Sequence, residues 1–464
     1  MHNLLENDLA NLSILLERTK AASDEYLNSI NERPPATAFA AKDRLELPEQ
    51  GLGGEITLTV FLERYGDHMP ASNGPRFWGL VTGGTTPASL MGDWLTGVYD
   101  LNLSHAANSI APNIEMEAIH MLRELFGLPA SFSGTFVSGA TMSNFAGIAI
   151  AREWIGQQYG KSISQEGLHA IPPVKILSCE AHSSSFKALS MLGLGRASLK
   201  TIPRLPENRE AADVLELKKA LEGLDGEPCI VIANAGTVNT VDFDDLQAIA
   251  ALKSEFRFWL HVDAAFGGFA ACSPKFKHLL NGIEQADSVT IDAHKWLNVP
   301  YDSAMIFTRH RDLQIAVFQN SGAYLGAIAE PMDFIHLAPE NSRRMRALPA
   351  WFSLMAYGKE GYRGIVERNC EMAQKLGARI EESREFRLLA PVRMNVVCFT
   401  LNGDAVAERV KDFLAKLRDD GRVFMTPTTY MGVPGIRAAF SNWRTEEADV
   451  ETAWQAMKAH SVNR

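Results

Sequence analysis

The chain has 464 residues, of which 46% are hydrophobic and 22% are charged, and its formal net charge is −10 at pH 7. This length and composition are typical of a folded protein with a large core, or with two or three domains. The negative charge and the lack of long basic runs argue against a nucleic-acid partner, and apolar stretches such as "CIVIANAG" are too short to cross a membrane.

The first 32 residues predict one amphipathic helix, because six leucines recur at near-helical spacing, at positions 4, 5, 9, 12, 15 and 16. The stretch "NERPPATAF" ends this helix. Acidic residues interrupt the apolar pattern throughout, which is not typical of a signal or transit peptide. We interpret residues 1–70 as an N-terminal helical segment whose apolar stripe packs either on its own domain or on a partner subunit.

Residues 71–345 predict a large α/β domain. The stretch "TMSNFAGIAIAREWIGQQYG" predicts a long helix that ends at Gly160. Short apolar strands then alternate with helices, as in "VKILSC", "PCIVIANAG", "FRFWLHVD", "SVTID" and "SAMIFT". Such strands are typical of a mostly parallel sheet covered by helices, in which active sites gather at the carboxyl ends of the strands.

Residues 346–464 predict a smaller α+β domain. Its strands are "NVVCFTL" and "GIRAAFS", and a helix between them is expected to start at an N-cap, Asp404, and to stop at Gly421. The stretch "TEEADVETAWQAMKAH" predicts a final helix with acidic residues in its first turn.

The cysteines indicate a reducing compartment. The five of them, at positions 179, 229, 272, 370 and 398, are scattered and show no CxxC spacing. This pattern predicts buried thiols in a cytoplasmic protein rather than disulfides or zinc ligands, so no metal site is expected.

Two charged residues stand at the ends of predicted apolar strands. Asp263 ends the strand in "FRFWLHVDAAFGG", and Lys295, directly after His294, follows the strand in "SVTIDAHKWLN". A buried charge is costly unless it is paired or chemically modified. An amine that can form an imine, an acid that keeps a pyridine nitrogen protonated, and a site for phosphate are the groups that pyridoxal 5'-phosphate requires.

The phosphate site is predicted in the stretch "VSGATMSN". Gly139, Ala140 and Thr141 lead directly into the long helix, whose first N–H groups and dipole attract an anion. Thr141 adds a hydroxyl group, and Asn144 can support the same turn.

Two further stretches end at the same predicted edge of the sheet. His182 in "SCEAHSSSFKAL" offers a flat imidazole that can lie over a pyridine ring, and Thr237 in "ANAGTVNTVDFDDL" occupies the same topological position. Each residue alone has an ordinary structural explanation, such as a core histidine or an ion-pair partner. Five stretches in this order, all at predicted strand ends, favour the cofactor site over those explanations.

These motifs resemble the pyridoxal-phosphate-dependent decarboxylases related to aromatic amino acid and glutamate decarboxylases. The stretches "HVDAAFGG" and "DAHKWLN" carry the resemblance most specifically, and it extends from "WGLVTGGTTPASLMGDWL" to "IRAAFSNWRTEEADVETAW". The resemblance implies the fold-type I architecture, with a mostly parallel seven-stranded sheet in the large domain. It also implies a homodimer whose shared active sites lie near the subunit interface.

The resemblance also implies a role for individual residues. Lys295 resembles the lysine that binds the cofactor carbonyl, Asp263 the partner of the pyridine nitrogen, and His182 the imidazole stacked on the ring. The remaining matches are Ala265 against the opposite ring face, Ala140, Thr141 and His294 at the phosphate, Thr237 beside the cofactor, and Arg437 at the substrate carboxylate.

Two positions depart from the family pattern. The family often has asparagine where this chain has Asp292, and an acid close to a phosphate is repelled by it. Aligning "DFIHLAPENSRRMR" with a loop of the family places Phe334 where many members have the tyrosine that protonates Cα. Phenylalanine cannot donate a proton, so Tyr324 or His336 could serve as the acid instead.

The expected reaction is decarboxylation of an L-amino acid to its amine and CO2. In such families a phenylalanine at the position of Phe334 accompanies oxidative deamination to an aldehyde, ammonia and hydrogen peroxide, whereas the retained His182 favours ordinary decarboxylation. Another pyridoxal-phosphate lyase or an aminotransferase is a further alternative. A non-catalytic assembly protein is a remote one, against which the intact Lys295 and Asp263 argue.

The substrate side chain is the least readable feature. By resemblance, the stretch "RFWGLV" lines the pocket and contributes Phe77 and Val81. Phe77 and Trp78 slightly favour an aromatic substrate, although they can equally belong to the core. Arg76 could instead be the second cation that an acidic amino acid requires.

Overall fold

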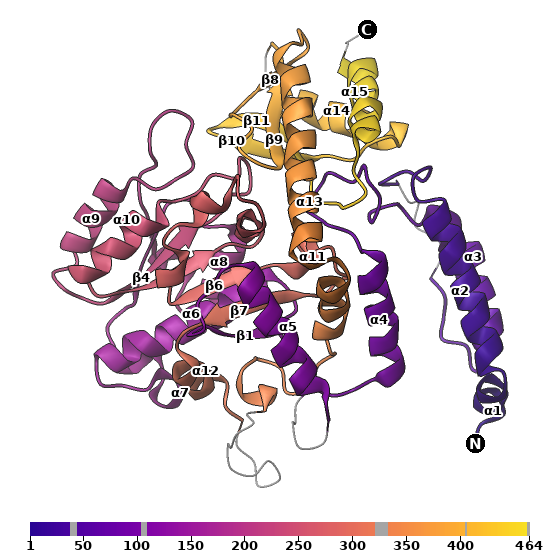
Figure 1. Ribbon diagram of the computed structural model, residues 1–464, viewed down its shortest axis with the longest axis horizontal. Coiled ribbons are helices and arrows are strands. Elements are labelled where there is room, and N and C mark those ends of the chain that lie inside the picture. Colours follow the sequence, from indigo (N-terminus) through magenta and orange to yellow (C-terminus); the bar gives the residue numbers. More distant parts are fainter. Residues whose placement is uncertain (38–43, 104–108, 321–332, 404–405, 462–464) are drawn as a thin grey trace.

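The computed structural model describes residues 1–37, 44–103, 109–320, 333–403 and 406–461. Figure 1 shows a large α/β body, a smaller sheet joined to it by a long helix, and an arm formed by the N-terminal helices. No helix in these ranges has the length and apolar character that a membrane span requires.

The large body is built on one seven-stranded sheet with the strand order β1-β7-β6-β5-β4-β2-β3. Only β7 runs antiparallel to its neighbours, so the predicted mostly parallel sheet of fold type I is confirmed. The strands are β1 (Ser133–Val137), β2 (Lys175–Ser178), β3 (Leu199–Thr201), β4 (Cys229–Asn234), β5 (Phe258–Asp263), β6 (Ser288–Ile291) and β7 (Ala304–Thr308).

Helices cover both faces of this sheet because its central strands are buried along their whole length. The helices of the large body are α4 (Pro87–Tyr99), α5 (Ala111–Leu125), α6 (Ala140–Gln158), α7 (Ile163–Glu166), α8 (Ser183–Met191), α9 (Val214–Glu222), α10 (Leu246–Ala251), α11 (Ala293–Trp296) and α12 (Arg311–Phe318). Of these, α4 packs on the long helix α13 (Ala347–Glu381).

Helix α6 is the long helix predicted from "TMSNFAGIAIAREWIGQQYG", and it packs across β5, β6 and β7. It ends just before Gly160, whose φ of 68° lies in the left-handed region that glycine favours. Gly147 allows a close approach to the sheet, since a Cβ atom at this position would lie 2.5 Å from the His261 ring. A small residue in α6 therefore makes room for a polar side chain of β5.

The smaller sheet is antiparallel, with the order β10-β11-β9-β8. The long helix that leads to it contains a non-helical residue, Gly358, with a φ of 55°. The predicted helix starts at Ala407 rather than at Asp404, which lies outside the described residues, and it stops at Gly421 as predicted. The elements are α13 (Ala347–Glu381), β8 (Phe386–Leu388), β9 (Val396–Leu401), α14 (Ala407–Asp420), β10 (Thr426–Tyr430), β11 (Val433–Ala439) and α15 (Glu447–Ser461).

The N-terminal arm consists of α1 (Asn3–Ala10), α2 (Leu12–Asn28) and α3 (Gly54–Tyr65). The prediction of one continuous helix was wrong, because the chain leaves helical geometry at Asn11, with φ −107° and ψ 16°. Helices α2 and α3 lie side by side, and an ion pair of 2.8 Å joins Arg18 to Glu55. None of the residues in these three helices is buried within the single chain.

All five cysteines are unpaired, and each lies in the described part of the chain. Four are buried, and burial raises the pKa of the Cys179 and Cys229 thiols to about 12. These thiols are therefore protonated packing groups at neutral pH. The cytoplasmic location inferred from the sequence stays a prediction.

Candidate active site

A cavity of about 540 Å³ lies at the carboxyl ends of β4, β5 and β6, where the sequence predicted the site. Lys295 and Asp263 both line it, so the two charged residues that the sequence places at the ends of apolar strands share one cavity. The other predicted residues that line it are Val81, Ala140, Thr141, His182, Thr237, Ala265, Asp292, His294 and Arg437.

Lys295 is placed by the single turn α11, which directly follows β6. Its Nζ atom lies 3.7 Å from Asp292 Oδ2 and 5.4 Å from the centre of the Phe266 ring. Gly83 packs against this turn so closely that a Cβ atom there would lie 1.6 Å from the Lys295 carbonyl oxygen. The Gly83 N–H also donates to the His294 carbonyl oxygen at 3.2 Å. The turn is therefore fixed by a segment more than two hundred positions away.

Asp263 is held in one orientation by two N–H donors. The backbone N–H of Ala265 donates to Oδ1 at 3.1 Å, and the Asn144 side-chain amide donates to Oδ2 at 2.8 Å. The carboxylate is buried, and both donors stabilise its charged form. Asn144 thus supports the carboxylate of Asp263, whereas the sequence analysis expected it to support the phosphate turn.

The orientation of the Asn144 amide is fixed by a buried histidine, His261, which was not predicted from the sequence. Asn144 Oδ1 lies 2.9 Å from His261 Nε2, and His261 Nδ1 lies 2.7 Å from the hydroxyl of Ser288. Burial lowers the pKa of His261 to about 4, so the ring is neutral at pH 7 and donates from Nε2 to the amide oxygen. The signal in the sequence was a histidine inside the apolar strand "FWLHVD".

His182 is the N-cap of α8, and its free face is open to the cavity. Its Nδ1 accepts the Ser184 backbone N–H at 3.2 Å and lies 2.7 Å from the Ser184 hydroxyl. The surrounding protein removes water from the ring and so lowers its pKa, which the charge of Asp263 partly offsets. The Ser184 hydroxyl accepts from Asn144 at 3.0 Å, so one amide supports both Asp263 and His182.

The N-terminus of α6 faces the cavity at Ala140, as predicted for a phosphate site. A carboxylate already lies there, since the Ala140 N–H points to Asp292 Oδ2 at 3.4 Å. His294 Nε2 lies 3.2 Å from the other oxygen of Asp292. The predicted phosphate ligand His294 is therefore directed toward an acid.

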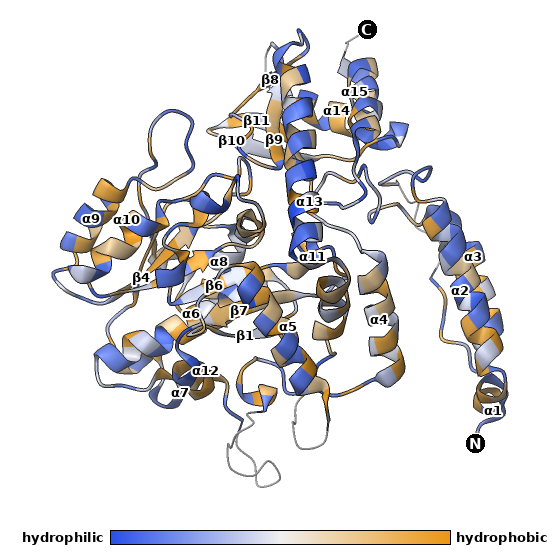
Figure 2. Cartoon of the chain, viewed as in Figure 1, coloured by the Kyte–Doolittle hydropathy of each residue, from blue (hydrophilic) through white to orange (hydrophobic). Residues whose placement is uncertain are grey.

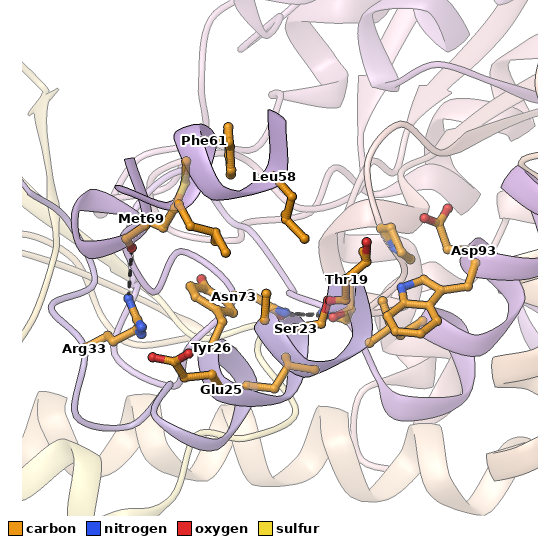
Figure 3. Close-up of a pocket in the computed structure, with 18 of the residues that line it drawn as sticks. Thr19, Ser23, Glu25, Tyr26, Arg33, Leu58, Phe61, Met69, Asn73 and Asp93 are labelled. Carbon is orange, nitrogen blue, oxygen red and sulfur yellow. Dashed lines mark hydrogen bonds between the residues drawn. The ribbon is translucent and has the colours of Figure 1, made fainter. Parts of the chain in front are cut away.

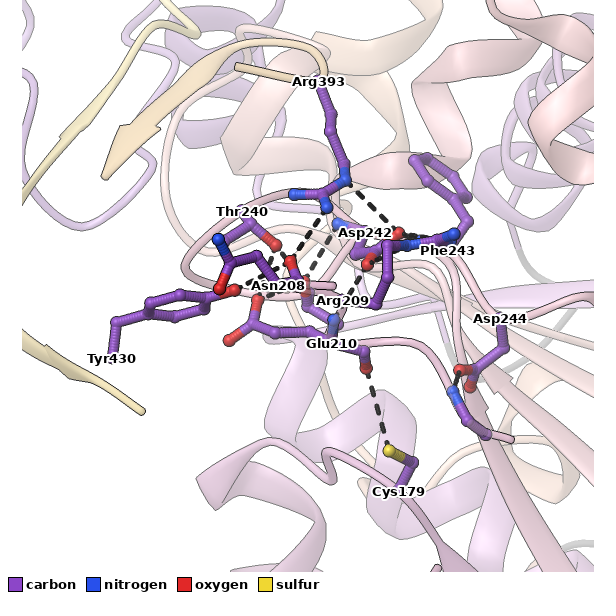
Figure 4. Close-up of polar contacts among 12 residues, drawn as sticks. Cys179, Asn208, Arg209, Glu210, Thr240, Asp242, Phe243, Asp244, Arg393 and Tyr430 are labelled. Carbon is purple, nitrogen blue, oxygen red and sulfur yellow. Dashed lines mark hydrogen bonds and ion pairs between the residues drawn. The ribbon is translucent and has the colours of Figure 1, made fainter. Parts of the chain in front are cut away.

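Thr237 lines the cavity and contacts a polar cluster around Glu210 and Asp242. Figure 4 shows the residues of this cluster. Its hydroxyl donates to the buried carboxylate of Glu210 at 2.6 Å and accepts the Asp242 backbone N–H at 2.9 Å. Two side chains from the C-terminal part of the chain reach the same cluster, because both Arg393 and Tyr430 donate to the carbonyl oxygen of Asn208. Glu210 was not found from the sequence, since the loop that contains it carries no motif.

Arg437 reaches the cavity from β11 of the smaller sheet. Its Nη1 donates to the Val238 carbonyl oxygen at 3.1 Å, and burial lowers its pKa. Its Nε has no hydrogen-bond partner among the residues that the structure describes. The side chain can therefore donate to an anion inside the cavity.

Some predicted site residues lie elsewhere in the chain. Phe77 stacks on Phe424 with 4.9 Å between ring centres and does not line the cavity. Phe334, in the short 3-10 helix η8 (Phe334–His336), packs with Leu103 and Leu337, and neither it nor His336 lines the cavity. Tyr324 lies outside the described residues.

The cavity residues fit pyridoxal 5'-phosphate. An amine, a buried carboxylate held by N–H donors, a flat neutral imidazole and a helix N-terminus line one cavity at a sheet edge. The unpartnered Nε of Arg437 adds a donor suited to the carboxylate of a substrate. The carboxylate of Asp292, which lies at the N-terminus of α6, opposes the cofactor phosphate.

Comparison with known proteins agrees with this site. The family model "Pyridoxal-dependent decarboxylase conserved domain" matches residues 68–402. The aromatic-L-amino-acid decarboxylase of Bacillus atrophaeus is 26% identical over 94% of this chain and 89% of its own length. The phenylacetaldehyde synthase of Petunia hybrida is 25% identical over 84% of this chain and 81% of its own length.

Solved structures share the fold. The crystal structure of Oryza sativa TDC with PLP and tryptamine superimposes with a TM-score of 0.90 at 22% identity, covering 97% of this chain and 98% of that one. The structure of mouse CSAD superimposes with a TM-score of 0.88 at 22% identity, covering 98% of this chain and 99% of that one. With the family model matching most of its length, the chain belongs to the pyridoxal-dependent decarboxylases, enzymes that use pyridoxal 5'-phosphate to remove CO2 from an amino acid.

Proposed function

We propose that this enzyme converts an aromatic L-amino acid to its amine and CO2 in the cavity that Lys295, Asp263 and Arg437 line together. That shared cavity is the observation that carries the proposal. The aromatic preference is supported by the relatives, several of which are named aromatic-L-amino-acid decarboxylases. It does not rest on Phe77, which packs on Phe424 outside the cavity.

Each charged residue has one task in this proposal. Bound pyridoxal phosphate supplies an electron-accepting ring for the electron pair that CO2 leaves behind. Asp263 keeps a proton on the ring nitrogen, because its carboxylate is fixed by the Ala265 and Asn144 donors and cannot turn away. Arg437 orients the substrate carboxylate, and Lys295 holds the cofactor carbonyl before and after each turnover.

The neutral state of His182 suits a ring-stacking role. An uncharged imidazole can lie flat on the ring without repelling the proton that Asp263 maintains on the nitrogen. The lowered pKa of His182 provides that neutral state at pH 7. Ala265 lines the same cavity and, being small, leaves room for the ring on the opposite face.

Aldehyde synthesis is the second candidate, although Phe334, which the sequence placed at the position of the acid, packs with Leu103 and Leu337 outside the cavity. In that reaction the amino acid, O2 and water give the aldehyde, CO2, ammonia and hydrogen peroxide. The similar Petunia hybrida protein is named a phenylacetaldehyde synthase. Among the described residues, His182 lines the cavity, and a retained histidine at this position favours ordinary decarboxylation. On that ground we rank amine formation first.

One experiment separates the two candidates. The enzyme is incubated in air with a panel of the standard amino acids, and CO2, amine, aldehyde and peroxide are measured for each. We expect the aromatic amino acids to be the best substrates and to give one amine for each CO2. Peroxide formed in equal amount with CO2 would establish aldehyde synthesis. Preference for glutamate or aspartate would overturn the aromatic proposal.

We also propose that two copies form a homodimer through the N-terminal arm. A cavity of about 510 Å³ lies between α2, α3 and α4 in the single chain (Figure 3). Along these helices, hydrophobic residues alternate with hydrophilic ones (Figure 2). The large exposed apolar side chains of the arm and of α4 are Leu5, Leu9, Leu12, Ile14, Leu16, Ile56, Phe61, Leu62, Met91, Trp94, Val98 and Tyr99.

An apolar surface of this extent on an otherwise folded chain is typical of a subunit interface. The mass of the protein in solution, measured by light scattering, is expected to be twice that of the chain. Trp94 is 45% exposed, and Trp94→Glu should shift the mass toward the monomer. The control is Met431→Glu, because Met431 is 44% exposed on the smaller domain and should leave the mass unchanged. A monomeric wild type would contradict the proposal.

A further inference from the structure

Asp292 places a buried carboxylate at the helix terminus where the phosphate of the cofactor is expected. It follows β6 directly, is 1% exposed, and its backbone N–H donates to the Ala265 carbonyl oxygen at 2.8 Å. Its Oδ2 is 3.4 Å from the Ala140 N–H, the first of α6. The helix N-terminus therefore already faces one anion before a phosphate binds.

Several titratable groups face this carboxylate from the surrounding elements. From α11, His294 Nε2 lies 3.2 Å from Oδ1, and Lys295 Nζ lies 3.7 Å from Oδ2. From the segment before β7, the Tyr301 ring lies tilted against His294, with ring centres 4.3 Å apart. Burial raises the pKa of Tyr301, and the charge of Asp292 adds to the effect. At the N-cap of α8, the charge of Asp292 also acts to raise the pKa of His182, although more weakly than burial lowers it.

A carboxylate and a phosphate cannot both use these donors while both are fully ionised. Each offers only acceptor oxygens, and like charges at hydrogen-bond distance in a buried site are strongly unfavourable. Oδ1 of Asp292 accepts no hydrogen bond in the described part of the structure, although the His294 ring lies 3.2 Å away, so an O–H group at this oxygen could donate to a phosphate oxygen. An amide at the same position would donate to the phosphate without any added proton.

We propose that Asp292 makes binding of the cofactor phosphate depend on proton uptake. One extra proton enters the group formed by Asp292, His294 and the phosphate, and an O–H···O hydrogen bond replaces the repulsion. The proposal rests on the proposed function, since it needs the phosphate at the N-terminus of α6. It predicts that the affinity for the cofactor phosphate falls as the pH rises above the second pKa of a phosphate ester, about 6.

The probe is pyridoxine 5'-phosphate, which has the phosphate but no aldehyde and so cannot react with Lys295. Its binding to the full chain freed of cofactor is measured by calorimetry at several pH values, in buffers of different ionisation enthalpy. For the wild type we expect uptake of about one proton and an affinity that weakens about tenfold between pH 7 and pH 8. For Asp292→Asn we expect no uptake in that range, a flat affinity, and tighter binding at pH 8.

Two further variants keep the test decisive. Asp292→Ser also removes the charge and should behave like Asp292→Asn, should the amide variant fold poorly. The control is Asp287→Asn. Asp287 directly precedes β6, whereas Asp292 follows it, and its carboxylate pairs with Lys253 and His310. This variant should keep the proton uptake of the wild type. Equal proton uptake in the wild type and Asp292→Asn would overturn the proposal. Failure of the wild type to bind pyridoxal phosphate itself, seen as no visible absorption, would overturn the proposed function instead.

Discussion

Replacing Lys295 by alanine is expected to lower the rate of CO2 release by at least about 10³-fold, because no other amine lines the cavity among the described residues. The variant should still fold, since the Lys295 side chain donates no hydrogen bond to any residue that the structure describes and is 17% exposed. Turnover with the best substrate of the panel is measured together with visible absorption of the purified protein. The visible band of protein-bound cofactor should be lost or shifted.

The matched control is Lys187→Ala, which removes an exposed lysine of α8 close to His182 in sequence and should leave turnover unchanged. The wild-type protein, reduced with borohydride and digested, should carry the cofactor on the peptide that contains Lys295. Labelling of a different lysine, or full activity of Lys295→Ala, would contradict the assignment of this residue.

The second large effect is expected for Asp263→Asn, which should lower turnover by at least about 10²-fold to 10³-fold. Asparagine has nearly the same shape, but a neutral amide cannot hold a proton on the ring nitrogen, so the ring becomes a weaker electron acceptor. The amide would also face the Ala265 and Asn144 N–H groups with one oxygen instead of two. Turnover is compared with cofactor content, which is measured after release of the cofactor in alkali.

The ratio of these two measurements identifies the role of Asp263. A variant that retains its cofactor and loses turnover supports the role at the ring nitrogen. A variant with turnover within tenfold of the wild type at equal cofactor content would show that Asp263 is only a structural group. Asn144→Asp is a useful comparison, because it keeps the shape and removes the N–H donor that fixes Asp263 Oδ2.

The arrangement around Asn144 explains why these residues act together. One buried amide donates to Asp263 and to Ser184, and Ser184 in turn contacts His182. The groups intended for the ring nitrogen and for the ring face are thus connected through a single side chain. His261 is neutral because of its burial, and its hydrogen bond to Asn144 Oδ1 prevents the amide from rotating by half a turn and exchanging its oxygen and nitrogen atoms.

The sequence by itself determined the class of fold and most of the cavity. Continuous apolar strands alternating with helices are a local pattern, and it is sufficient to predict a parallel sheet with its polar residues at the strand ends. Asp263, Lys295, His182 and Thr237 were found in this way, because each directly follows or ends a strand, and the structure places all of them at one cavity. A residue at the end of one strand can be assigned to the edge of the sheet from the sequence alone, because this assignment does not require the order of the strands.

Only the tertiary structure decided which side chains touch. The contact of Asn144 with His261 joins α6 to β5, and the hydrogen bond of Thr237 to Glu210 joins two loops. Asp292 is a second example, because the sequence showed that this acid was unusual but not that its side chain lies at the Ala140 N–H. Phe77 is a third, because its ring stacks on Phe424, far away in the sequence. Such contacts depend on strand order and on the close packing of α6 at Gly147, and neither is encoded in any single stretch of the chain.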